Sequence, residues 1–326
     1  MIRWLFLMAF SLLSACAPRI HEPGPAIVEP SLENDAFIAA DEARLALRTW
    51  QSATPPAAVV LAVHGFNDYS NAYAELGAYL AQNGITVYAY DQRGFGETDP
   101  VGIWPGEPAL IGDLTVIARL LRARHGQTSL FVMGESMGGA VAMVAMTQPN
   151  PPPVDAAILF APAVWGRATM PWYQRAALSI ASYTVPWMKV TGEGLRIRAS
   201  DNIEMLRALG RDPLFIKKTR VDALHGITDL MDAALAAAPR LKTPALILYG
   251  EKDEIIPRQP TFRMLDQLPA QEAGDRRIAL YENGYHMLFR DLNRKIVWRD
   301  VLSWIGNREA PLPSGADAHA TAVRGR

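Results

Sequence analysis

Strand patterns and helical patterns alternate along most of the chain. The strand patterns, most of them continuous apolar runs, occupy residues 57–63, 85–90, 129–133, 154–160, 244–249 and 277–281. Apolar residues recur at helical spacing over residues 69–81, 108–124, 140–146, 259–268 and 293–305. Continuous apolar runs are typical of parallel strands covered on both faces. The alternation therefore predicts an α/β protein with a doubly wound, mostly parallel sheet.

Two segments depart from this alternation. Residues 37–40 and 44–50 flank a polar turn, and the second run alternates apolar and polar positions, which predicts an antiparallel hairpin at a sheet edge. Residues 162–240 contain no convincing buried strand. Helical patterns within them, at 172–183, 203–209 and 228–238, predict a helical cap inserted into the sheet domain.

These patterns predict a core domain in two parts, residues 36–161 and 241–308, separated by the cap at 162–240. Residues 309–326 are rich in Ala, Gly, Pro and Ser without an apolar period, so we expect a disordered tail. Residues 16–35 contain four prolines among polar residues and are expected to form a flexible tether.

The N-terminus has the pattern of an export signal, predicted over residues 1–15. Arg3 precedes an apolar stretch from Trp4 to Leu13, which is too short to span a bilayer comfortably. Leu13-Ser14-Ala15-Cys16 resembles the lipobox of bacterial lipoproteins, in which the cysteine carries acyl chains. An ordinary signal peptide with a chance cysteine is the alternative. Cys16 is the single cysteine of the chain, so no disulfide can form within it.

The net charge of the chain says little about its function. The chain has 32 Lys and Arg against 33 Asp and Glu, with no basic stripe, so nucleic acid is not an expected partner. Beyond the predicted signal, no apolar run approaches membrane-spanning length. We therefore expect an exported protein, held at a membrane of the bacterial cell envelope through lipidated Cys16. Its oligomeric state is not predictable from the sequence.

A G-x-S-x-G pentapeptide, centred on Ser136, joins the apolar strand at 129–133 to a helical run. A serine hydroxyl becomes a nucleophile when it sits on a tight, exposed turn beside a base and near donors for the developing oxyanion. Gly134 and Gly138 remove side chains that would clash in such a turn. The alternative is a glycine-rich turn that only packs a helix on the sheet.

A base and an acid are expected at other strand ends, where functional groups of parallel sheets collect. Asp253 and His286 each follow a late strand, and the order Ser136, Asp253, His286 is that of the α/β-hydrolase triad. Glu251 and Glu254 are alternatives to Asp253. The rivals of His286 all have simpler structural interpretations: His64 as a brace of its loop, His125 at a helix end, and His225 within the insertion.

The oxyanion hole requires two backbone N–H donors. We assign one to Met137, directly after the nucleophile, and the other to Phe66 in the loop after the first parallel strand. Gly94-Phe95-Gly96 begins like a dinucleotide fingerprint, but Asp99 replaces its last glycine. No metal-binding motif is present either, so no cofactor or metal is expected.

The chain resembles the monoglyceride lipase and lysophospholipase branch of the α/β-hydrolases, also called serine aminopeptidase-like hydrolases, over about residues 36–306. The resemblance rests on five motifs in order: His64–Ser70, Asp91–Thr98, Gly134–Gly139, Gly250–Asp253 and Gly284–His286. Glu135 and Phe95 differ from the commonest family forms, often His or Gln at the first position and His at the second. The resemblance implies the fold and the triad, and less firmly the substrate.

The resemblance and the composition of the insertion together predict a serine hydrolase of lipid-like esters such as monoacylglycerols or lysophospholipids. The insertion is rich in large apolar residues, although most of them could simply pack the cap onto the core. As a group they favour an acyl-accepting pocket, with Trp165, Trp172, Tyr173 and Trp187 as candidates. A peptidase, amidase or acyltransferase with the same triad is the alternative, as is a catalytically idle lipoprotein scaffold.

Overall fold

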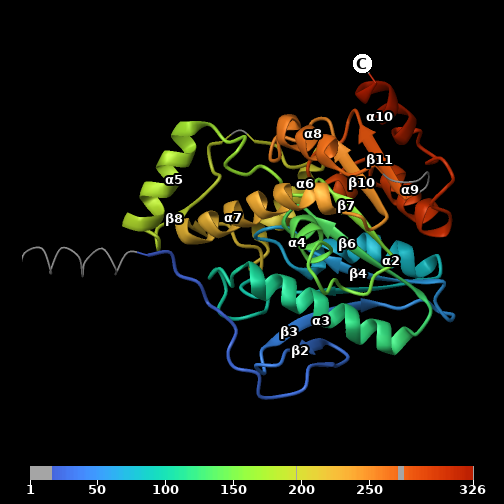
Figure 1. Cartoon of the computed structure of the whole chain (residues 1–326), viewed down its shortest axis with the longest axis horizontal. Coiled ribbons are helices and arrows are strands. Elements are labelled where there is room, and N and C mark those ends of the chain that lie inside the picture. The colour runs from blue at the N-terminus through green and yellow to red at the C-terminus, as the bar shows by residue number, and fades with distance from the viewer. Residues whose placement is uncertain (1–16, 196, 271–274, 326) are drawn as a thin grey trace, which may run out of the picture.

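The computed structural model describes residues 17–195, 197–270 and 275–325 of the chain (Figure 1). Nine strands of these residues form one sheet in the order β1-β2-β3-β5-β4-β6-β7-β10-β11. The strands span Ser31–Leu32 (β1), Ala36–Ile38 (β2), Arg44–Trp50 (β3), Ala58–Val63 (β4), Ile85–Tyr90 (β5), Ser129–Glu135 (β6), Ala156–Phe160 (β7), Ala245–Gly250 (β10) and Arg276–Tyr281 (β11).

The sheet is mixed but mostly parallel, which confirms the predicted fold class. β1, β2, β3 and β5 pair antiparallel in turn, so the predicted edge hairpin corresponds to β2 and β3. All pairs from β5 through β4, β6, β7 and β10 to β11 are parallel. Val63 pairs with Gly134, and Gly250 pairs with Tyr281, at the ends of their strands. The loops that follow the parallel strands therefore emerge at one edge of the sheet.

Helices cover both faces of the sheet, so its central strands β4 and β10 are buried along their whole length and β6 from Leu130 onward. One face packs against α3, α4, α7 and α8, and the other against α2 and α9. These helices span Glu107–His125 (α3), Met137–Ala145 (α4), Val221–Ala237 (α7), Arg258–Gln267 (α8), Ala74–Gln82 (α2) and Arg294–Gly306 (α9). Short 3₁₀ turns occupy Ser70–Tyr73 (η1), Ala238–Arg240 (η2) and Leu288–Arg290 (η3).

The segment between β7 and β10 is largely helical, as expected for an insertion. It contains α5 (Trp172–Thr184), β8 (Lys189–Val190), α6 (Ile203–Arg211), β9 (Thr219–Arg220) and then α7. α7 packs on α4 and is buried along much of its length, so it belongs to the helical layer of the core. The projecting part of the insertion therefore ends before α7, and α5 forms the left-hand end of the molecule in Figure 1.

Residues 17–35 are extended, but they lie against the core instead of hanging free as a flexible tether. His21 N donates to Trp104 O (2.8 Å), and the backbone N–H groups of Ile27 and Val28 both donate to Ala40 O. The segment ends in β1, which adds to the sheet beside β2. Its prolines favour extended backbone, which can run along a surface and donate hydrogen bonds from the residues between them. Cys16 and the predicted signal lie outside the described residues.

The predicted disordered tail is wrong for most of its length. Residues Ala316–Arg324 form α10, which packs on β11 beside α8. Ala320 is buried there, and Arg277 of β11 forms an ion pair of 2.7 Å with Asp317. Small alanine side chains let this helix approach the sheet closely. Because this segment has few large apolar residues, its sequence pattern predicted disorder instead of a helix.

Within the described ranges, no helix is both long enough and apolar enough to cross a bilayer.

Candidate active site

Ser136 occupies the tight turn between β6 and α4. Its backbone has φ 50° and ψ −112°, a left-handed conformation that is costly for a residue other than glycine. A Cβ on Gly138 would lie 2.0 Å from Val63 O, and one on Gly134 would lie 2.5 Å from the backbone of Gly138. The two glycines therefore allow the close strand-helix approach that the turn requires. Ser136 N donates to Phe160 O (2.9 Å), which ties the turn to β7.

Asp253 and His286 are hydrogen-bonded to each other, with 2.8 Å between Asp253 Oδ2 and His286 Nδ1. The other carboxylate oxygen of Asp253 accepts from the backbone N–H groups of Ile255 (2.8 Å) and Ile256 (2.9 Å), which fixes the carboxylate plane. Burial alone would lower the pKa of His286, but the charge of Asp253 and its hydrogen bond outweigh burial and raise this pKa. A proton on Nδ1 donating to the carboxylate leaves Nε2 as the basic nitrogen.

The two neighbouring carboxylates, of Glu251 and Glu254, contact other residues than His286. Glu251 contacts His319 Nε2 (2.8 Å) on α10, and Glu254 accepts from the backbone N–H of Arg198 (2.7 Å). Of the three acidic residues in this loop, Asp253 is thus the one that contacts His286. Ser136, Asp253 and His286 are all buried and all follow parallel strands at the same sheet edge.

The other histidines have structural partners. His64 Nε2 accepts from the backbone N–H of Gln92 (2.9 Å), and Nδ1 lies 2.8 Å from Gly65 O, so this ring braces its loop. Burial lowers the pKa of His64, which keeps the ring neutral. His125 contacts the Tyr88 hydroxyl (3.0 Å), and His225 contacts Asp229 (3.1 Å). Both histidines are therefore engaged in contacts away from Ser136.

The predicted oxyanion donors lie on two elements next to Ser136. Met137 is the first residue of α4, so its N–H is one of the four that a helix leaves without an intrahelical acceptor. Phe66 is in the loop after β4, and a Cβ on the preceding Gly65 would lie 3.5 Å from Ser136 Cβ. The loop of Phe66 therefore passes directly beside the serine. Phe66 packs its ring edge-on against Phe95.

Sequence reasoning missed a buried ion network next to the serine. Arg290 Nη1 lies 2.7 Å from Asp68 Oδ2, and Nη2 lies 3.0 Å from Glu135 Oε2. Burial alone would lower the pKa of Arg290, but the two carboxylates outweigh it and raise this pKa. Burial raises the pKa of Glu135, against the opposing effect of Arg290. Asp68 belongs to the loop of Phe66 and Glu135 precedes Ser136, so the network links both to η3.

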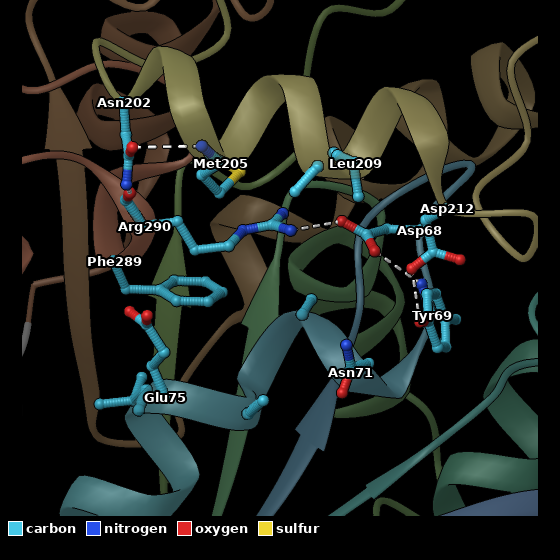
Figure 2. Close-up of a pocket in the computed structure, with 14 residues that line it drawn as sticks. Asp68, Tyr69, Asn71, Glu75, Asn202, Met205, Leu209, Asp212, Phe289 and Arg290 are labelled. Carbon is cyan, nitrogen blue, oxygen red and sulfur yellow. Dashed lines mark hydrogen bonds and ion pairs between the residues drawn. The ribbon is translucent and has the colours of Figure 1, made fainter.

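A cavity of about 240 Å³ borders this network, between α6 on one side and η1 and α2 on the other (Figure 2). Arg290 reaches across its wall toward Asp68, and Phe289, Met205 and Leu209 supply apolar lining. Ser136, Asp253 and His286 do not line this cavity. The cavity therefore adjoins Asp68 and Arg290 of the ion network and not the serine itself.

The insertion is tied to every loop that carries a candidate residue. Four hydrogen bonds make these connections: Ala163 N to Ser136 O (2.9 Å), Ile216 N to Asn67 O (2.9 Å), Arg198 N to Glu254 Oε2 (2.7 Å) and Met287 N to Ala199 O (2.9 Å). The insertion thus stands over the sheet edge whose loops carry Ser136, Asp253 and His286.

None of the four apolar cap candidates lines the cavity beside Arg290. Trp165 is half-buried and packs against the core, whereas Trp172 and Trp187 are 77% and 54% exposed. Tyr173 is exposed beside Trp172. Three of these side chains are therefore largely exposed, and their role in an acyl pocket stays a prediction. The pattern over residues 172–183 predicted the helix α5 correctly, but periodicity does not tell which face of a helix the rest of the chain covers.

Among the residues described, no three His, Cys, Asp or Glu side chains are arranged to hold a metal ion.

The sheet order, the turn at Ser136 and the Asp253–His286 pair together define an α/β-hydrolase fold. The family model described as serine aminopeptidase, S33, matches residues 54–293, and the chain belongs to this family. Its relatives place it in the monoglyceride lipase-like branch.

Similarity to individual members is distant but spans nearly their full length. The chain is 24% identical over 289 residues to the monoglyceride lipase of Rattus norvegicus, covering 84% of this chain and 90% of the relative. It is 25% identical over 291 residues to the monoacylglycerol lipase of Mycolicibacterium smegmatis, covering 86% and 99%. A crystal structure of a soluble variant of the Saccharomyces cerevisiae monoglyceride lipase has 20% identity and a TM-score of 0.68, covering 90% and 99%.

Proposed function

We propose that the protein is a serine hydrolase that cleaves carboxylic esters of lipid-like substrates such as monoacylglycerols or lysophospholipids. The observation that carries this proposal is the buried Asp253–His286 pair at the sheet edge where Ser136 occupies a strained turn. Strain at a non-glycine residue persists when a function requires the side chain to point outward. The distant similarity to monoglyceride lipases supports an ester of a lipid alcohol as the substrate class.

In the proposed reaction, Ser136 Oγ attacks the ester carbonyl carbon while its proton passes to His286 Nε2. The negative charge that develops on the carbonyl oxygen is bound by the backbone N–H groups of Phe66 and Met137. The intermediate collapses by breaking the carbon–oxygen bond to the leaving alcohol, which receives the proton from His286. Asp253 stabilises the imidazolium through the 2.8 Å contact with Nδ1.

Deacylation repeats these steps with water as the nucleophile. His286 takes a proton from water, whose oxygen attacks the acyl carbon on Ser136. The second intermediate releases the carboxylic acid, and Ser136 regains its proton from His286. Two steps, acylation and deacylation, thereby replace direct attack of water on the ester, and each has a lower barrier than that attack.

The test combines an active-site probe with a substrate series. A fluorophosphonate should label the wild-type chain at Ser136, and Ser136→Ala should lose both labelling and nearly all hydrolysis, on the order of 10⁶-fold in kcat. Ser303→Ala, on α9, is the matched control and should behave as wild type. p-Nitrophenyl esters of increasing chain length should then show a preference for long acyl chains.

Two results would count against this function. A folded chain that the probe never labels would favour the scaffold alternative. Labelling at Ser136 with faster turnover of amino-acid amides than of any ester would favour the peptidase alternative, which the family description also covers.

We further propose that the mature chain begins at Cys16 and is anchored by acyl chains on that residue, at a membrane of the bacterial cell envelope. The supporting observation is the lipobox-like stretch that ends in the single cysteine. Mass spectrometry of the protein purified from its own membranes should find an acylated N-terminal peptide starting at Cys16. An unmodified N-terminus at another residue would refute the anchor.

A further inference from the structure

The backbone on both sides of His286 is held by hydrogen bonds. Tyr285 N, directly before the histidine, donates to Asp291 Oδ2 (2.8 Å). Met287 N, directly after the histidine, donates to Ala199 O (2.9 Å). Asp291 lies before α9, whereas Ala199 belongs to the insertion. The backbone of the candidate base is therefore restrained from two separate elements.

Ser200 joins these two elements to each other. Its hydroxyl donates to Asp291 Oδ1 (2.6 Å), and its oxygen accepts from Asn202 N (3.1 Å). Ser200 is fully buried, and Asp291 is 3% exposed. Burial raises the pKa of Asp291 to about 6, so its carboxylate is mostly charged at neutral pH. A charged acceptor forms stronger hydrogen bonds than a neutral one, so Asp291 holds both of its donors firmly.

We use the name clamp segment for residues 198–202, because each of them makes a hydrogen bond to a loop of the candidate site. After Ala199 and Ser200, Asp201 Oδ1 accepts from Leu292 N (2.8 Å). Asn202 Nδ2 donates to Arg290 O (3.0 Å), and Figure 2 shows the two residues side by side. The insertion thus follows the loop of His286 from residue 287 to residue 292.

The same segment also reaches the loop of the candidate acid. Arg198 N donates to Glu254 Oε2 (2.7 Å), and Glu254 directly follows Asp253. Consecutive residues of the clamp segment therefore hold both loops whose side chains form the 2.8 Å contact between Asp253 Oδ2 and His286 Nδ1. A contact between two loops keeps its length only if neither loop moves relative to the other.

The position of His286 in the fold makes this support important. Its loop follows β11, which is the outer strand of the described sheet and pairs with β10. The loop of Ser136 follows β6, which lies between β4 and β7 and is held from both sides. The sheet therefore restrains the candidate base less than the candidate nucleophile, and the clamp segment adds restraint on the open side.

We propose that Asp291 and Ser200 are positioning residues for the base. Together they hold the backbone beside His286, so that Nδ1 stays against Asp253 and Nε2 remains the free basic nitrogen. The proposal rests on the proposed function, since the position of a base matters only if Ser136 is the nucleophile. It makes a residue of the insertion, Ser200, part of what sets the rate of the chemical step.

Three variants separate the hydrogen bonds from the charge. Asp291→Ala removes the acceptor of Tyr285 N and of the Ser200 hydroxyl. Ser200→Ala removes only the bond from the insertion and leaves the carboxylate in place. Asp291→Asn removes the charge but can keep both bonds, because its oxygen can accept from Tyr285 N and its amide group can donate to Ser200 Oγ.

Asp300→Ala, on α9, is the matched control. Asp300 is fully buried, and like Asp291 it accepts from a serine hydroxyl and from a backbone N–H, here both of Ser314. It also accepts from the Tyr281 hydroxyl (2.7 Å). The control therefore removes an equivalent buried carboxylate that does not contact the loop of His286. Urea unfolding should show that this control is destabilised.

The variants are compared by their kcat and KM on a p-nitrophenyl ester. Misplacing a catalytic group by about 1 Å can cost roughly 10²-fold, so Asp291→Ala should lower kcat by about that factor and Ser200→Ala by about 10-fold, with KM nearly unchanged. Asp291→Asn should keep most of the activity, and Asp300→Ala should keep wild-type kcat. Adding Ser200→Ala to Asp291→Ala should cause no further loss, because Ser200 acts through Asp291.

An NMR titration of the chain with isotope-labelled histidine measures the pKa of His286 without any substrate, with His286→Gln to assign the signal. Burial lowers this pKa, but the contact with Asp253 raises it above the usual value. A loosened contact should therefore let the pKa of His286 fall toward that value in Asp291→Ala and Ser200→Ala. Asp291→Asn and Asp300→Ala should leave it close to wild type.

Three results would overturn the proposal. In the first, Ser200→Ala keeps both wild-type kcat and the wild-type pKa of His286, so the insertion does not position the base. In the second, Asp291→Asn is as slow as Asp291→Ala, so the charge acts and not the hydrogen bonds. In the third, Asp300→Ala lowers kcat as much as Asp291→Ala, so the loss reflects stability alone.

Failure of the proposed function would look different. A wild-type chain that neither hydrolyses esters nor labels at Ser136 would refute that function. The NMR titration would still show whether Asp291 and Ser200 hold His286 against Asp253.

Discussion

Arg290→Met tests whether the buried ion network supports the candidate active site. The side chain of Arg290 is 10% exposed, and those of its partners Asp68 and Glu135 are 3% and 2% exposed. Methionine replaces the aliphatic stem of arginine and removes its guanidinium group and charge. The substitution therefore leaves two buried carboxylates facing each other without a cation.

The expected cost follows from this burial. Removing one partner of a buried ion pair typically costs about 3–5 kcal/mol, because the remaining charge is desolvated and unpaired. Arg294→Met is a matched control, because Arg294 pairs with Glu75 (2.6 Å) where the two side chains are 24% and 62% exposed. An exposed pair of this kind contributes about 0–1 kcal/mol. The buried substitution should thus lower the melting temperature by roughly 10 °C and the control by a few degrees at most.

The stability loss of Arg290→Met should depend on pH, and the direction follows from the pKa of Glu135. Burial already raises the pKa of Glu135 in the folded protein, and Arg290 opposes that increase. Without Arg290 the folded-state pKa rises further above the unfolded value, so the folded protein binds more protons than the unfolded chain. The deficit of the variant should therefore shrink as the pH is lowered through the folded-state pKa and grow as the pH rises.

Urea unfolding of both variants at pH 5 and pH 8, followed by circular dichroism, measures these free energies. Adding Asp68→Asn and Glu135→Gln to Arg290→Met should recover part of the lost stability at pH 8, because no buried charge remains unpaired. Arg290→Met and Arg294→Met could instead lose the same free energy of unfolding, or the loss in Arg290→Met could be independent of pH. Either result would show that the ion network does not stabilise the fold by the expected amount.

Three further predictions concern the site and the chain end. Asp253→Asn should lower kcat about 10⁴-fold and move the acid limb of the kcat/KM profile to lower pH, because Asp253 raises the pKa of His286; an unmoved limb would contradict the pairing. Gly138→Ala, whose Cβ would lie 2.0 Å from a β4 carbonyl oxygen, should destabilise the fold and abolish probe labelling; a soluble variant with full labelling would mean that the turn relaxes freely. Deleting residues 309–326 should lower the melting temperature and promote aggregation, since α10 covers β11; light scattering identical to wild type would argue against that cover.

Local patterns were sufficient to predict the sheet and the three candidate triad residues. The parallel strands are buried on both faces, so their apolar runs are continuous and easy to recognise. Asp253 and His286 could be located because each follows such a run at its carboxyl end. The alternation of strands and helices implies a parallel sheet, and the carboxyl ends of neighbouring parallel strands lie at the same edge. Asp253 and His286 are therefore brought into contact.

Features that depend on long-range packing were not predictable from these patterns. Arg290 lies in a short 3₁₀ turn, and nothing in its neighbourhood along the chain indicates that Asp68 and Glu135 surround it. The unusual acidic residue at position 135 was the one available signal. α10 was missed because alanines can pack a helix closely without an obvious apolar stripe.

The order of the strands also bears on when the protein can act. β6 and the turn that holds Ser136 are synthesised well before β10 and β11, which bring Asp253 and His286. β11 is the outer strand of the sheet and pairs with β10 alone, so the histidine reaches its place only when the last part of the sheet is added. A ribosome-bound chain therefore carries the proposed nucleophile without its base. The cell that makes this hydrolase would be protected from its activity until the chain is complete.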